Sequence, residues 1–153
     1  MPNFSLTTNW NIPAPIETVW LAMLDTEQWP NWWKYVKKVE EIKEGDSFGV
    51  NNIRRYFWKT CLPYQLILNL EVTQLVPYRS ISVNVSGDLE GKGYCKFSVQ
   101  PQHTSIFIVW NVKTCKQWMS HWPTISHPVF VWNHKQVMKQ GEKGLMQRLS
   151  YDQ

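Results

Sequence analysis

The first thing missing from this sequence of 153 residues is a long apolar run. Residues 106–110 and 129–132 are among the longest apolar stretches, far short of the ~20 residues of a membrane-spanning helix. Residues 1–5 also lack the basic flank and apolar core of a signal peptide. Charged residues make up only 18% and aromatic residues 14%, which excludes the charge-rich, aromatic-poor composition of disordered chains. We therefore predict a soluble, cytoplasmic protein with one domain over residues 1–153.

Cysteine is scarce, and the motifs of several enzyme classes are absent. Cys61, Cys95 and Cys115 are widely spaced and include no C-x-x-C pair, so they predict neither a disulfide framework nor a zinc site. No G-x-G-x-x-G, P-loop or G-x-S-x-G motif supports nucleotide binding or serine hydrolysis. His127 and His134 would lie ~10 Å apart along one helix, too far to hold one ion together. We expect no metal and no cofactor.

Acidic residues are absent between Gly91 and Gln140, a stretch that holds six lysines and all four histidines. One interpretation is a solvated surface dotted with lysines. The other is an electropositive surface for an anionic ligand, an anionic membrane or a nucleic acid. The chain has only four arginines, which makes nucleic acid the weaker option because bidentate recognition favours arginine.

Apolar and polar residues alternate with a period of two over much of the chain, which predicts β-strands. The predicted strands are residues 4–12, 36–43, 54–60, 64–73, 80–85, 89–100 and 104–114. Gly87-Asp88 predicts a hairpin turn. Helical spacing predicts short helices at residues 15–24 and 25–33, the second interrupted at Trp29-Pro30, and Ser126 is expected to cap a final helix that ends near Leu149. The short connections favour an antiparallel sheet and an α+β fold.

Several segments resemble the START-like (SRPBCC, or Bet v 1-like) superfamily, and within it the polyketide cyclase/dehydrase-type group. The resemblance begins with WNIPAPIETVW at residues 10–20 and continues at residues 29–33, 62–64, 87–93 and 132–145. It implies a helix-grip fold, in which a curved antiparallel sheet of about seven strands wraps around a long C-terminal helix and two short helices follow strand 1. It also implies an apolar ligand cavity between sheet and helix.

We predict that ligand contacts come from the inward faces of the strands and from the apolar stripe of the final helix. These residues are Trp58, Leu68, Leu70, Val83, Gly91, Gly93, Trp110, Phe130, His134, Val137 and Met138. The alternative is that they only fill a core. Of the ten tryptophans, Trp58 and Trp110 are expected in the pocket, whereas those at positions 10, 20, 29, 32 and 33 are assigned to the opening strand and the short helices.

Three ionisable residues are candidates for catalysis: His134, Tyr56 and Arg55. A histidine on the covering helix can act as an acid or base, although it can equally be a hydrogen-bonded packing residue. Alternation leaves two registers open, with either Arg55 or the pair Arg54 and Tyr56 facing inward. The sequence thus predicts a protein that binds a small apolar, aromatic, polyketide- or lipid-like ligand. The alternatives are a polyketide aromatase/cyclase or dehydrase, and an interaction module with a basic surface.

Overall fold

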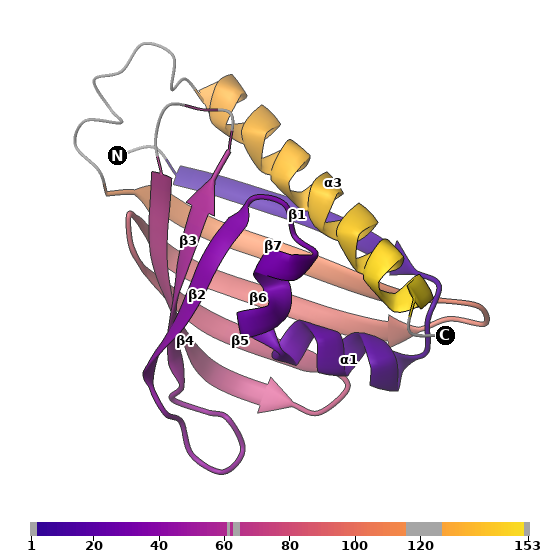
Figure 1. The fold of residues 1–153 in the computed structure, drawn as a ribbon. Coiled ribbons are helices and arrows are strands. Elements are labelled where there is room, and N and C mark those ends of the chain that lie inside the picture. The colour runs from indigo at the N-terminus through magenta and orange to yellow at the C-terminus, as the bar shows by residue number, and fades with distance from the viewer. Residues whose placement is uncertain (1–2, 61, 63–64, 116–126, 152–153) are drawn as a thin grey trace.

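The computed structural model describes residues 3–60, 62, 65–115 and 127–151. A seven-stranded antiparallel sheet runs in the order β1-β7-β6-β5-β4-β3-β2. Its strands are β1 (Asn3–Ile12), β2 (Val36–Lys43), β3 (Ile53–Lys59), β4 (Gln65–Val76), β5 (Ser80–Gly87), β6 (Leu89–Val99) and β7 (Thr104–Thr114). The helices are α1 (Ile16–Leu24), the 3-10 helix η1 (Thr26–Asn31) and α3 (His127–Tyr151). Figure 1 shows the curved sheet wrapped around α3, which confirms the predicted helix-grip fold.

The strands follow the alternation in the sequence. In β1, Phe4, Leu6, Trp10 and Ile12 are buried, and Trp10 lies opposite the buried Ile106 of β7. The hairpin predicted at Gly87-Asp88 joins β5 to β6, and Gly87 adopts a positive φ of 105°, a conformation that favours glycine. The inward faces that position the site are therefore the ones that the period of two specifies.

The second short helix differs from its prediction. Pro30 lies inside η1, which runs to Asn31 without the interruption expected at Trp29-Pro30. A 3-10 helix of this length loses only one hydrogen bond to a proline, and the main-chain N–H groups of Trp32 and Trp33 both donate to the carbonyl of Trp29. The turn after Pro30 is thereby held in place.

Helix α3 presents the predicted apolar stripe to the sheet. Phe130, Val137, Met138, Leu145 and Leu149 are all buried. A β-carbon built at Gly141 would lie 2.5 Å from Cε2 of Trp33 and 2.7 Å from Cζ2 of Trp10, so this glycine lets two indoles reach the helix backbone. The predicted cap, Ser126, lies outside the described residues. None of the described helices combines the length and apolar character that crossing a membrane requires.

Candidate functional site

A cavity of about 730 Å³ lies between the sheet and α3. Strands β3 to β7 supply its floor and α3 supplies its roof, while α1, η1 and Trp33, which follows η1, close one side. Most lining side chains are aliphatic or aromatic, including Leu66, Leu68, Leu70, Val72, Ile81, Val83, Ile108, Val112, Phe130, Val137 and Met138. The structure thus places a large internal space where the sheet and helix would otherwise pack.

Ten of the predicted ligand-contact residues line this cavity. They are Trp58, Leu68, Leu70, Val83, Gly93, Trp110, Phe130, His134, Val137 and Met138. They come from six different elements, β3 to β7 and α3, so the fold, rather than a local motif, brings them together. Their contact with a ligand stays a prediction.

Gly91 does not line this cavity. Its φ is +151°, and an added β-carbon would lie 2.0 Å from the main-chain oxygen of Asn111 in β7. The glycine is therefore required by the close approach of two strands and not by a ligand. The sequence shows that a side chain is missing there, but not which neighbour takes up the space.

Gly93 serves the cavity directly. A β-carbon there would lie 3.0 Å from Cζ3 of Trp110 and 3.0 Å from Cγ2 of Val83. Gly93 lies between these two residues in the ladder, opposite Val83 on β5 and opposite Trp110 on β7. The missing side chain lets the Trp110 indole reach over β6 and form part of the cavity floor.

The register of β3 places Tyr56 and Arg54 on the cavity side and Arg55 on the outer face. Nε of Arg55 donates a hydrogen bond of 3.0 Å to Oδ1 of Asn69, its cross-strand neighbour. Arg55 therefore does not reach the cavity, unlike the other two predicted catalytic residues, His134 and Tyr56. Arg54 and Tyr56 occupy the lining instead.

The two remaining candidates for catalysis carry no charge near neutral pH. Burial raises the pKa of Tyr56 to about 12, so its hydroxyl stays protonated. Burial lowers the pKa of His134 to about 4, so its imidazole stays neutral and can accept a proton. Among the described residues, Nε2 of His134 and the indole nitrogens of Trp29 and Trp58 have no hydrogen-bond partner although all three atoms are buried.

An aromatic wall was missed by the sequence analysis. Trp20, Trp29 and Trp33 line the cavity although they were assigned to the core around the short helices. The ring of Trp33 lies 5.0 Å from that of Trp58 and 5.1 Å from that of Trp29, and Trp29 lies 5.4 Å from Tyr56. The only feature of the sequence that could have predicted this aromatic wall is the close spacing of the tryptophans at positions 29, 32 and 33.

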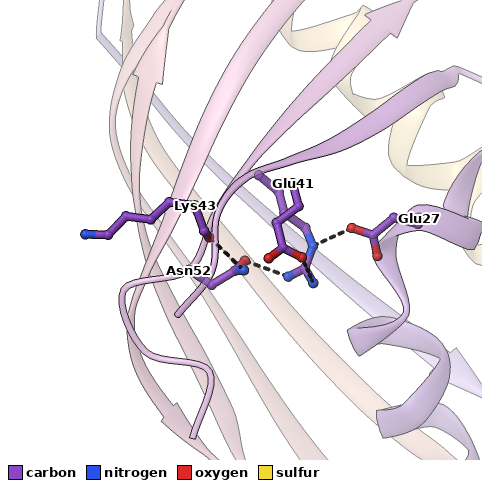
Figure 2. A network of polar contacts seen from close by, with 5 residues as sticks. Glu27, Glu41, Lys43 and Asn52 are labelled. Carbon is purple, nitrogen blue, oxygen red and sulfur yellow. Dashed lines mark hydrogen bonds and ion pairs between the residues drawn. The ribbon is translucent and has the colours of Figure 1, made fainter. Parts of the chain in front are cut away.

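One end of the cavity is polar. We call the part lined by Glu41, Glu44, Asp46 and Arg54 the charged end. Nε of Arg54 lies 2.6 Å from Oε1 of Glu27, and its Nη1 donates a 2.6 Å hydrogen bond to Oδ1 of Asn52. Figure 2 shows Glu27, Glu41 and Asn52 converging there from η1, β2 and the segment before β3. Arg54, in β3, thereby connects η1 to β2 and β3.

Cys95 also lines the cavity, but its chemistry is limited. Burial raises the pKa of this thiol to about 12, so the nucleophilic, metal-binding thiolate does not form at neutral pH. Across residues 3–60, 62, 65–115 and 127–151, no group of three His, Cys, Asp or Glu residues is placed to hold a metal ion.

Among the described residues, exposed lysines of the acid-free stretch lie on two sides of the sheet. Lys92 and Lys96 alternate with the inward residues of β6 and are exposed on its outer face. Lys135 and Lys139 are exposed on α3, which covers the inner face. These lysines therefore do not form one continuous basic surface.

The sequence itself identifies the family. A family model described as polyketide cyclase/dehydrase and lipid transport matches residues 12–99, more than half of the chain. The chain belongs to this family. No curated protein sequence matches it at a significant level.

Solved structures share the fold of this polyketide cyclase/dehydrase and lipid transport family member at low sequence identity. The Zhui aromatase/cyclase from Streptomyces sp. R1128 has a TM-score of 0.77 at 12% identity, with 96% of this chain and 93% of that chain covered. A START superfamily protein from Mycobacterium smegmatis has a TM-score of 0.75 at 14% identity, with 99% of both chains covered. The ginseng major latex-like protein 151 from Panax ginseng has a TM-score of 0.70 at 9% identity, with 95% and 97% covered. These similarities establish the START-like fold.

Proposed function

We propose that this family member binds a small apolar ligand, aromatic, polyketide- or lipid-like, in the cavity between the sheet and α3. The observation that carries the proposal is the cavity of about 730 Å³, lined mostly by aliphatic and aromatic side chains. Small-molecule pockets span about 300–1,000 Å³ and are lined mostly by apolar residues with a few polar groups. Transfer of an apolar ligand from water into such a space is favourable by about 25 cal/mol per Å² of buried surface.

The cavity walls suit a rigid, aromatic ligand in particular. Trp29, Trp33, Trp58 and Trp110 offer ring faces or edges from both the sheet and the short helices. Aromatic pairs contribute about 0.5–1.5 kcal/mol beyond their area. Tyr56 adds a protonated hydroxyl that can donate to a ligand oxygen.

Titration with the neutral dye Nile red tests this proposal. Binding is expected to enhance the dye's fluorescence, to quench the tryptophans and to raise the melting temperature, because the ligand stabilises only the folded state. The substitution Val83→Trp fills the floor beside Trp110 and is expected to weaken binding at least tenfold. Val99→Trp is the matched control, since Val99 is 69% exposed and does not line the cavity. The proposal is wrong if the dye leaves fluorescence and melting temperature unchanged in the unmodified protein.

A second candidate function is cyclisation or dehydration of a polyketide-like ligand. It is favoured by the neutral imidazole of His134 and the protonated hydroxyl of Tyr56, which line the same cavity. With its pKa lowered to about 4, the imidazole of His134 is a weak base. Removal of a proton next to a carbonyl therefore also depends on the phenol of Tyr56, which can donate a hydrogen bond to the enolate oxygen that forms.

Incubation with a short poly-β-keto thioester distinguishes an enzyme from a carrier. An enzyme is expected to convert the substrate faster than the uncatalysed reaction, and His134→Gln and Tyr56→Phe should each lower kcat by about 10²–10⁴-fold, the usual range for general acid–base groups. Arg55→Gln is the control, because Arg55 lies outside the cavity. A rate equal to the uncatalysed one would eliminate this candidate and leave the carrier.

A further inference from the structure

The charged residues that line the cavity gather at its charged end. Glu41, Glu44 and Asp46 contribute three carboxylates there, and Glu27 adds a fourth through its 2.6 Å contact with Arg54. Arg54 is the one arginine or lysine among the described lining residues. The formal balance is an excess of three negative charges, in a chain whose net charge is +4. The charged end is thus opposite in sign to the protein as a whole.

The Arg54 guanidinium is already occupied by protein oxygens. Its Nε faces Glu27 at 2.6 Å, its Nη1 donates to Asn52 at 2.6 Å, and its Nη2 lies 3.6 Å from Oε2 of Glu41. Lys43 contributes only its main-chain carbonyl, which accepts a hydrogen bond from Asn52, and Figure 2 shows its side chain pointing away from the network. Neither cation is therefore available to an incoming anion.

The charged end is also an open end of the cavity. Glu41, Glu44, Asp46 and Phe48 line the cavity and are exposed, Phe48 by 78%. Towards the sheet, the lining changes to buried residues without charge, such as Leu68, Leu70 and Ile108. A ligand in the cavity would therefore have apolar side chains around its body and carboxylates near the end that lies at the opening.

We infer that the cavity selects ligands with an apolar body and a protonated amine at one end, and disfavours carboxylate ligands of the same size. The inference rests on the proposed function and names its ligand class. An ammonium group at the opening stays partly hydrated and gains attraction from the excess carboxylates. A carboxylate there meets repulsion with no free cation to compensate, and moving it inward would bury an unpaired charge.

Three naphthalene ligands of similar size test the inference: 2-naphthylmethylamine, 2-naphthalenemethanol and 2-naphthoic acid. Their affinities are measured by displacement of Nile red at neutral pH and low salt. Because one exposed charge pair changes affinity by about two- to fivefold, we expect the amine to bind about tenfold more tightly than the alcohol and the acid about tenfold more weakly. High salt should bring the three affinities together, since it screens exposed charges.

The double variant Glu41→Gln, Glu44→Gln locates the effect. The ratio of amine to acid affinity is expected to fall about fivefold or more. Because both affinities are measured on the same variant, damage to the cavity that weakens all ligands equally does not change this ratio. Glu90→Gln is the matched control: Glu90 is exposed on β6, does not line the cavity, and the ratio should not change. If Nile red and the alcohol bind but the amine has no salt-dependent advantage over the acid, the inference is wrong and the proposed function stands. If none of the probes binds, both are wrong.

Discussion

The indole Nε1 of Trp33 donates a hydrogen bond of 2.8 Å to the main-chain carbonyl of Val137, and so joins the segment after η1 to the middle of α3. Both residues also line the cavity. The contact therefore fixes the roof of the cavity relative to its aromatic wall. Farther along α3, Glu142 accepts a hydrogen bond of 2.9 Å from the main chain of Asn11, which anchors the same helix to β1.

Replacement of Trp33 by Phe is expected to destabilise the fold through loss of this donor. Trp10→Phe is a matched control, because Trp10 is also buried, yet its Nε1 has no partner among the described residues. Both variants lose similar ring volume, but only Trp33→Phe loses a hydrogen bond, which costs about 1 kcal/mol more. Urea unfolding of the two variants measures the difference. Equal losses would show that the hydrogen bond contributes nothing net.

Gly141→Ala is expected to lower stability although alanine favours helices over glycine by about 1 kcal/mol. The new methyl group would lie 2.5 Å from Trp33 and 2.7 Å from Trp10, so the indoles or the helix must shift. Overpacking of this kind costs about 1–3 kcal/mol. Lys143→Ala, at an exposed site of the same helix, is expected to be close to neutral. A higher melting temperature for Gly141→Ala would contradict the tight packing.

The elements of the fold were predictable because their signals are local. Alternation along β4 and β7 and the helical stripe from Phe130 to Leu149 give each element its type and its buried face. Short connections then leave few topologies besides an antiparallel sheet. The predicted interruption at Trp29-Pro30 was wrong because a 3-10 helix tolerates a proline that would end an α-helix.

The site was less predictable because it depends on which elements leave space between them. A buried tryptophan has the same periodicity whether it faces a core or a cavity, so Trp29 and Trp33 could not be told from packing residues. The choice between Arg54 and Arg55 needed the register of β3 against its neighbours. The charged end needed the loop after β2, which has no periodic signal of its own.

Gly93→Ala is expected to weaken ligand binding more than it weakens folding. The added β-carbon would lie 3.0 Å from both Trp110 and Val83, and the indole can relieve this contact by moving into the open cavity. Nile red affinity should then fall by about tenfold, as for loss of about 1.4 kcal/mol of binding energy. The control Ser98→Ala changes a residue on the outward face of the same strand. Unchanged dye affinity would show that Trp110 does not form the floor on which the ligand lies.

Protonation of His134 is expected to destabilise the protein as the pH falls. Burial lowers its pKa to about 4, below the ordinary value of 6.5, so between these values the unfolded chain binds a proton that the folded chain resists. The neutral, buried imidazole therefore contributes to the free energy of unfolding in full above pH 6.5. This contribution, at most about 3 kcal/mol, is lost as the pH falls towards 4. Urea unfolding from pH 7.5 to 4.5 should therefore show a shallower pH dependence for His134→Gln than for the unmodified protein. Lys135→Gln, an exposed neighbour on α3, should retain the steeper one, and identical slopes for all three proteins would place His134 in contact with water.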